Sequence, residues 1–272
     1  MMSLRDLIRK PLPHLSGRKE FILRALMVPN LLFTRIDGAE FLDATIVNQS
    51  TPCIFVFNHN NVFESLFVPV LVMFMTGGMR VSFVIDWMFG HLPVIGRLMN
   101  LIDPVFVYNK PSTLPFLESR RPKQSGGVLE QCLQRLHSGR CIGIFPEGRR
   151  NSDPFVLLRA KPGVGHLALM SGATVIPAGI RFTASARRGR APLVGRMVVR
   201  FGKPMRFGIM AEAYKASADD GRRADANRLA EAVADEVMGA IADLCGKACH
   251  HSRRSVDEAT ITRQTPEAIC QA

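Results

Sequence analysis

Residues Cys53 to Phe67 read CIFVFNHNNVFESLF, which joins two predicted structural elements through a polar junction. The five successive apolar residues CIFVF predict a strand that is covered on both faces of its sheet. The segment VFESLF predicts the start of a helix, because Asn61 is a favoured N-cap residue and places Glu64 at the third helical position, as in a capping box. A buried strand that runs directly into a helix favours an α/β protein.

The same alternation continues along the chain. Further apolar runs that predict strands are VSFVI, PVFVY, CIGIF, TVIPAGI and RMVVRF. Apolar residues at helical spacing precede Gly139, a favoured helix end, and a second apolar stripe predicts a C-terminal helix packed on the sheet. The residues of this second stripe are Leu229, Val233, Val237, Ile241 and Leu244. We therefore expect one α/β domain over residues 36–250, with a mixed, largely parallel sheet flanked by helices.

The two ends of the chain differ from this pattern. Residues 1–35 are basic and apolar-rich, which is typical of an amphipathic segment on an anionic membrane surface, or equally of a surface helix docked on the core. The segment after residue 250 loses apolar periodicity, so we expect residues 251–272 to be a disordered tail. The 47% hydrophobic content is sufficient for one substantial core.

The amino-acid composition limits the classes of binding partner and the cellular compartment that we expect. The net charge of +12 favours a polyanionic partner, either nucleic acid or an anionic membrane. Aromatic and basic residues do not alternate as in single-strand binders, so we expect no nucleic acid. Six scattered cysteines indicate reduced thiols. The N-terminus does not read as a secretory signal. The stretch Ser65 to Met79 is shorter than the roughly 20 apolar residues that span a bilayer. We therefore expect a cytoplasmic protein that is peripheral on the inner face of the membrane.

His59 lies in the junction of the opening stretch, five residues before Glu64. A neutral imidazole is a usable general base near neutral pH, and a carboxylate on its second nitrogen would hold the tautomer and stabilise the cation. Glu64 is a candidate for that carboxylate, although a purely capping role explains the same residue. The opening stretch alone leaves both interpretations open.

A second polar segment follows another predicted strand. The sequence CIGIFPEGRRNSD places Glu147, Gly148, Arg149 and Arg150 directly after apolar residues. Arg presents a fork of donors that matches phosphate oxygens, so these residues predict an anion and hydroxyl site. Downstream, Lys161 opens AKPGVGHLALMSGATVIPAGI, which predicts a short helix, a stop at glycine and a strand.

Taken in order, these blocks resemble the glycerolipid acyltransferase family, in which lysophosphatidic acid acyltransferases carry N-H-x4-D, then F-P-E-G-T-R-S, K-x-G-x-x-x-x-A and V-I-P-V. The resemblance covers about residues 50 to 205. It implies that His59 is the general base for an acceptor hydroxyl attacking an acyl thioester, without an acyl-enzyme. Glu64 stands where the family usually has Asp, one methylene shorter.

The resemblance also implies roles for the other blocks. Glu147, Gly148 and Arg150 correspond to the block that binds the phosphate-bearing acceptor, where Arg149 replaces the usual Thr, and Lys161 opens the next block. Pro177 corresponds to the block on the acyl-donor side. The block DPVFVYNK departs from the family, because Asn109 or Lys110 stands near an expected Arg.

We therefore expect an acyltransferase that moves a fatty acyl group from acyl-CoA or acyl carrier protein to a lysophosphatidic acid-like lyso-lipid, without a further cofactor. Lys110 or Arg149 would bind the phosphate if the acceptor carries one. The departure at Lys110 leaves open a lyso-aminolipid such as lyso-ornithine lipid, and the Glu64 variant leaves open a non-catalytic lipid-binding relative. Cys245, Cys249 and the histidines that follow match no standard zinc spacing, so we expect no metal.

Overall fold

The structure is a computed structural model, and it describes residues 4–42, 51–88, 103–108, 118, 127–183 and 196–249. Its helices are α1 (Leu4–Arg9), α2 (Arg18–Phe33), α3 (Glu40–Leu42), α4 (Val62–Met75), α7 (Val128–His137), α8 (Gly163–Ser171), α9 (Gly208–Asp219) and α10 (Arg223–Cys245). Its strands are β1 (Thr34–Asp37), β2 (Cys53–Phe57), β3 (Val81–Asp86), β4 (Val105–Val107), β5 (Cys141–Ile144), β6 (Val156–Leu157), β7 (Thr174–Thr183), β8 (Arg196–Phe201) and β9 (Ala248–Cys249).

Seven strands form one sheet in the order β1-β8-β7-β2-β5-β3-β4. The strands from β7 to β4 run parallel, and Phe55 in β2 lies opposite Ile176 in β7 and Gly143 in β5. β8 is antiparallel to β7 and parallel to β1, so β1 and β8 run against the other five strands. The mixed, largely parallel sheet predicted from the sequence is confirmed. Ligands of open α/β sheets bind beyond the carboxyl ends of the parallel strands, and the polar segments after β2 and β5 lie there.

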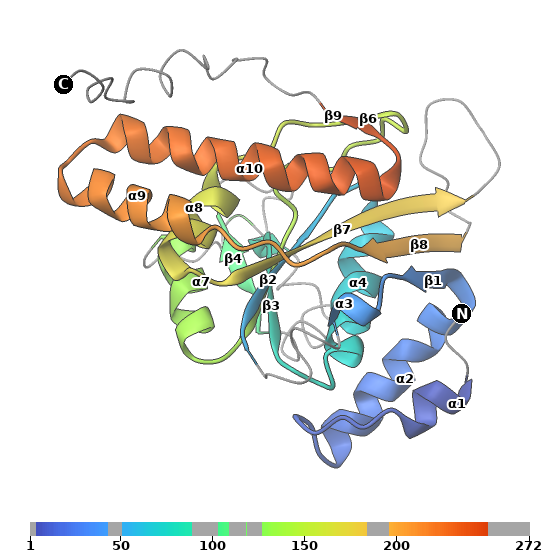
Figure 1. The fold of residues 1–272 in the computed structure, drawn as a ribbon. Coiled ribbons are helices and arrows are strands. Elements are labelled where there is room, and N and C mark those ends of the chain that lie inside the picture. Colours follow the sequence, from blue (N-terminus) through green and yellow to red (C-terminus); the bar gives the residue numbers. More distant parts are fainter. Residues whose placement is uncertain are drawn as a thin grey trace, which may run out of the picture.

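Strand β2 is buried on both faces, as its consecutive apolar residues predict. Phe55 and Phe57 pack in a cluster with residues of α2 and α4, whereas Ile54 and Val56 pack in a second cluster with α7, α8 and α10. Figure 1 shows α2 and α4 on one side of the sheet and α8 and α10 on the other. Both cores therefore hold β2 in place, and with it the polar junction at its carboxyl end.

The N-terminal segment docks on this core and also leaves apolar surface exposed. On α2, Leu23 and Met27 are buried in the cluster shared with α4, while Phe21 and Leu32 are 72% and 64% exposed. The buried residues agree with a helix docked on the core, whereas contact with a membrane stays a prediction. Strand β1, which the sequence did not indicate, follows α2 and crosses residue 35, where we expected this segment to end.

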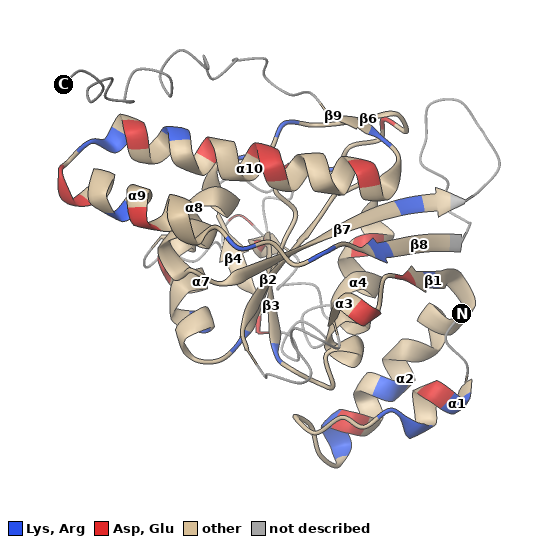
Figure 2. Cartoon of the chain, viewed as in Figure 1, with Lys and Arg blue, Asp and Glu red and all other residues tan. Residues whose placement is uncertain are grey.

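Arg24 ties the two N-terminal helices together. Its guanidinium donates to the backbone carbonyls of Leu7 in α1 and Lys10 after it, and pairs with Glu20 at 2.6 Å. Figure 2 shows basic positions beside acidic ones along the ribbon of α1 and α2. Arg24, one of the residues that contribute to the positive net charge, therefore stabilises the packing of α1 on α2.

The chain after α10 pairs with the segment that follows β5. Gly246 ends α10 with a φ of 69°, a left-handed conformation that glycine adopts readily. β9 then pairs with β6 in a small two-stranded sheet, Val156 opposite Ala248. In the described ranges, no helix combines the length and the apolar content needed to cross a bilayer. The predicted tail, residues 251–272, lies outside the described residues.

Candidate active site

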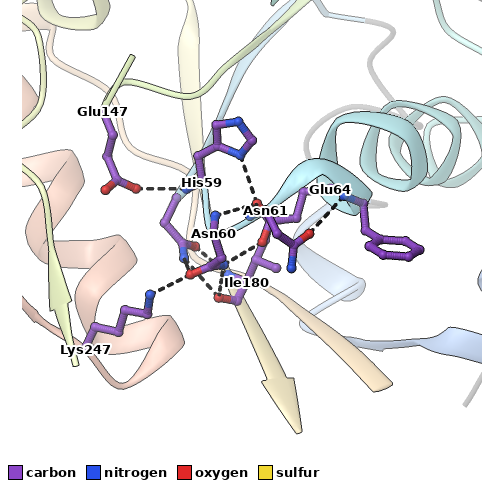
Figure 3. Close-up of polar contacts among 9 residues, drawn as sticks. His59, Asn60, Asn61, Glu64, Glu147, Ile180 and Lys247 are labelled. Atoms are coloured by element: carbon purple, nitrogen blue, oxygen red, sulfur yellow. Dashed lines mark hydrogen bonds and ion pairs between the residues drawn. The ribbon is translucent and has the colours of Figure 1, made fainter. Parts of the chain in front are cut away.

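His59 and Glu64 face each other where β2 passes into α4. His59 Nδ1 lies 3.1 Å from Glu64 Oε2, and the Glu64 side chain is fully buried while that of His59 is 15% exposed. A buried carboxylate accepts hydrogen bonds, so Nδ1 carries the hydrogen in this contact and Nε2 is the nitrogen that accepts a proton. Figure 3 shows the imidazole directed toward the Glu64 carboxylate. The pair has the arrangement of a general base with its orienting carboxylate.

The Glu64 carboxylate accepts several further hydrogen bonds. Oε2 accepts from the backbone N–H groups of Asn60 and Asn61 at 2.7 and 3.3 Å, and Oε1 accepts from the Asn60 side-chain amide at 2.6 Å. Asn61 is the N-cap of α4 and its side chain accepts from the N–H of Phe63 at 2.9 Å. The capping box predicted from the sequence is confirmed, and the same carboxylate contacts His59. Capping and orientation of the imidazole are therefore not alternatives.

Phe145 packs against the imidazole on the side of β5. The ring centroids of His59 and Phe145 are 4.6 Å apart, and Phe145 also contacts Phe57 and Phe83. This aromatic group belongs to the cluster between the sheet and α4. It gives the histidine ring an apolar wall, which limits the positions that the ring can adopt.

Glu147 holds the backbone of the same histidine. Its Oε1 accepts from the N–H of His59 at 2.8 Å and its Oε2 accepts from the N–H of Leu158 at 2.9 Å. Burial raises the pKa of Glu147 above its ordinary value, while the two N–H donors, Asn151 and the charge of Lys247 offset part of that rise. The carboxylate thereby joins the end of β2 to the segment after β5.

The segment after Glu147 presents positive charge to solvent. Gly148 turns the chain with a φ of 65°, and Arg149, Arg150 and Lys161 are exposed. A Cβ on Gly148 would lie 2.6 Å from Lys161 Cε, so the lysine side chain passes over the glycine. Lys161 is also tied to the loop through its N–H, which donates to the carbonyl of Pro146 at 2.9 Å. The predicted residues Gly148, Arg149, Arg150 and Lys161 thus gather in one basic loop cluster, beside Glu147.

A network of asparagines, which the sequence analysis did not identify, lies behind His59. Asn58 exchanges hydrogen bonds with the backbone of Ile180 in β7, accepting from its N–H at 2.6 Å and donating to its carbonyl at 3.0 Å. Asn60 donates to the same carbonyl at 3.2 Å and accepts from Lys247 Nζ at 2.5 Å. These contacts fix the junction to β7 and to the end of α10 (Figure 3).

Other residues singled out in the sequence have different surroundings. Pro177 is buried in β7, opposite Val56 of β2, and its carbonyl accepts from the N–H of Gly202 at 2.8 Å. Lys110 lies outside the described residues. Among the residues that are described, no group of histidines, cysteines and carboxylates is arranged to hold a metal ion.

Comparisons with known proteins give the following matches. The family model described as "Acyltransferase" matches residues 38–181, more than half of the chain. The 1-acyl-sn-glycerol-3-phosphate acyltransferase BAT2, chloroplastic, of Brassica napus is 26% identical over 148 residues, which are 53% of this chain and 36% of that protein. The chain therefore spans about a third of the length of this relative. The crystal structure of the 1-acyl-sn-glycerophosphate (LPA) acyltransferase PlsC from Thermotoga maritima aligns over 81% of each chain, with 15% identity and a TM-score of 0.49.

Proposed function

We propose, given that this chain belongs to the acyltransferase family, that it transfers a fatty acyl group from a thioester donor to a hydroxyl of a phosphate-bearing lyso-lipid. The observation that carries the proposal is the contact of His59 Nδ1 with the fully buried Glu64 carboxylate at 3.1 Å. It leaves Nε2 as the base, at the carboxyl end of a central parallel strand. The donor is acyl-CoA or acyl carrier protein, which act as co-substrates.

The proposed reaction is a direct transfer. Nε2 of His59 takes the proton of the acceptor hydroxyl as its oxygen attacks the thioester carbonyl carbon, and the tetrahedral intermediate collapses with cleavage of the carbon–sulfur bond. The proton then passes from the imidazolium to the leaving thiolate, which restores the neutral ring. Glu64 stabilises the imidazolium because a charge-assisted hydrogen bond is about twice as strong as a neutral one. No covalent acyl-enzyme is required.

The basic loop cluster supports a phosphate-bearing acceptor. Arg149, Arg150 and Lys161 are exposed beside Glu147, whose carboxylate holds the backbone of His59. Arg forks match phosphate oxygens, so a phosphate on this loop would bring a neighbouring hydroxyl toward the base. The name of the Brassica napus relative, which acts on 1-acyl-sn-glycerol-3-phosphate, agrees with such an acceptor.

Exposed apolar side chains near the site support docking on a membrane. Asn30 of α2 donates to the carbonyl of Phe67 in α4 at 3.3 Å, so these two helices lie side by side where α4 leaves the site. The exposed apolar residues on this part of the two helices are Val28, Leu32, Phe33, Val62, Phe63 and Leu66. We propose that they enter the acyl layer of an anionic inner leaflet, with α1 and the basic residues of α2 near the headgroups.

An acceptor screen tests the reaction. Purified protein is incubated with labelled acyl-CoA or acyl carrier protein and with lysophosphatidic acid, a neutral monoacylglycerol or lyso-ornithine lipid, and products are identified by mass spectrometry. We expect acylated product from lysophosphatidic acid. Product from lyso-ornithine lipid alone would contradict the phosphate-bearing acceptor, and binding of lyso-lipid without turnover of any acceptor would contradict catalysis.

Vesicle flotation tests the docking separately. Wild-type protein should float with vesicles of anionic phospholipid, and Leu32→Glu should remain largely in the bottom fraction because it places a charge in the acyl layer. Ile209→Glu is a matched control, since Ile209 on α9 is also exposed, at 87%, but lies on a different helix. Equal flotation of all three proteins would contradict the proposed docking surface.

A further inference from the structure

Lys247 reaches the network behind His59 from the end of α10, well beyond the segment that matches the family model. Its Nζ donates to Asn60 Oδ1 at 2.5 Å and to the carbonyl of Asp153 at 2.8 Å. Figure 3 shows the lysine side chain extended toward Asn60 from the opposite side to Glu64. A cation therefore lies at one end of a chain of hydrogen bonds that has the imidazole at its other end.

The backbone fixes the position of Lys247. Gly246 ends α10 in a left-handed conformation, and the next residues pair with β6, with the N–H of Ala248 donating to the carbonyl of Phe155 at 2.7 Å. Lys247 stands between these two constraints. The backbone of Lys247 is thereby held within reach of the site, and its side chain contacts Asn60 and the carbonyl of Asp153 from there.

The Asn60 amide has donors on one side and acceptors on the other. Its Oδ1 accepts from Lys247 and from Asn58 Nδ2, the latter at 3.3 Å. Its Nδ2 donates to Glu64 Oε1 at 2.6 Å and to the carbonyl of Ile180 at 3.2 Å. An ammonium group only donates and a carboxylate only accepts, so a single orientation of the amide satisfies both neighbours. Lys247, Asn58 and the carbonyl of Ile180 all favour the orientation in which Asn60 donates to Glu64, and Lys247 is the charged group among them.

We propose that Lys247 is a positioning residue for acyl transfer, acting through Asn60 to hold the Glu64 carboxylate and, through it, the ring of His59. This inference rests on the proposed function for its kinetic consequences. The order of contacts is Lys247 to Asn60, Asn60 to Glu64, and Glu64 to His59. Lys247 does not touch the reacting atoms, so its effect falls on kcat and not on binding of the acceptor.

Kinetics of Lys247 variants test the proposal. Lys247→Met should lower kcat about tenfold, the effect of one lost charge-assisted hydrogen bond, with KM within about twofold. Lys247→Arg should recover most of the loss, and Lys247→Glu should be worse than Lys247→Met because an acceptor at this place favours the reversed amide. Lys215→Met, which removes a charge from the exposed face of α9, is the matched control and should equal the wild type.

A double-mutant cycle with Asn60→Ala separates positioning from support of the fold. If Lys247 acts through Asn60, Lys247→Met should change kcat by less than about twofold in the Asn60→Ala background. Additive losses would overturn the proposal, since they would mean that Lys247 acts by another route, through Asp153 and the β6–β9 pair or through its charge on Glu147. If Lys247→Met does not fold, Lys247→Leu, which also lacks a donor, takes its place, and a kcat equal to that of the wild type overturns the proposal equally.

A spectroscopic measurement tests the positioning role of Lys247 without requiring acyl transfer. In protein labelled with ¹⁵N-histidine, the His59 resonances, assigned with His59→Gln, should report the tautomer with hydrogen on Nδ1. Lys247→Met should add a population with hydrogen on Nε2, while Lys215→Met should not. Absence of product from every acceptor would refute the proposed function and leave this test standing. An unchanged His59 tautomer in Lys247→Met would refute the positioning role even if acyl transfer is observed.

Discussion

Replacing Glu64 with Gln separates the carboxylate's effect on His59 from its role in the helix cap. The side-chain oxygen of Gln can take the place of Oε2, which accepts from His59 Nδ1 and from the backbone N–H groups of Asn60 and Asn61. The amide nitrogen then faces the Asn60 side chain, donor against donor, where Oε1 accepted at 2.6 Å. One buried donor is left without an acceptor, which costs about 1–3 kcal/mol of unfolding free energy.

Catalysis should fall because the imidazolium loses its charged partner. A hydrogen bond to a charged group contributes about 1.5–3 kcal/mol, and about 1.4 kcal/mol corresponds to a factor of ten in rate. We therefore expect Glu64→Gln to lower kcat about 10- to 100-fold with little change in KM, measured by acyl transfer under saturating donor. Denaturant unfolding of the same protein reports the loss of stability.

Asn61→Ala is the control for the cap. It removes the side-chain acceptor of the Phe63 N–H but keeps the Glu64 carboxylate, so it should lose about 1 kcal/mol of stability and keep kcat within about twofold. A Glu64→Gln enzyme with kcat equal to that of the wild type would refute the reasoning, because the carboxylate would then serve only the helix.

Three further predictions concern the segment after β5. Burial raises the pKa of Glu147 above its ordinary 4.5, so the folded state binds more protons than the unfolded state. The contribution of this group to stability should therefore fall as the pH rises from about 4.5. Glu147→Gln should remove this pH dependence from the unfolding free energy. Arg150→Met should raise KM for a phosphate-bearing acceptor about tenfold, the loss of one charge-assisted contact, whereas Arg159→Met, at an exposed pair with a glutamate, should not. Gly148→Ala should raise that KM, because the exposed Lys161 side chain must move away from the new Cβ, and should lower the unfolding free energy by roughly the 1–2 kcal/mol that a left-handed alanine costs. Gly139→Ala, with a similar φ and open space around it, should show the backbone cost alone.

Much of the fold is visible in the sequence because its signals are local. The buried strand CIFVF, the N-cap Asn61 and the stripe of α10 each follow from residues within one or two turns of the chain. The pairing of His59 with Glu64 is of the same kind, since a strand end and a helical third position fix their separation. The structure adds that one carboxylate both caps α4 and contacts the imidazole.

The remaining contacts join distant segments, and local patterns carry no signal for them. β1, with the sequence TRID, is short and mostly polar, so no local pattern marks it as a strand. It is a strand because it pairs with β8. Lys247 is a single charge after α10, and its contact with Asn60 joins residues 187 positions apart. Glu147 was predicted to belong to the substrate site, but its hold on the backbone of His59 requires the sheet order to be known.

The central claim is that Nε2 of His59 removes the proton of the acceptor hydroxyl. The most direct test is a single-turnover measurement of acyl transfer by wild-type and His59→Gln proteins of equal thermal stability, with saturating donor and lysophosphatidic acid. Loss of general-base catalysis predicts a rate lower by about 10²–10⁴-fold in the variant, with acceptor binding retained. A His59→Gln rate equal to that of the wild type would contradict the account.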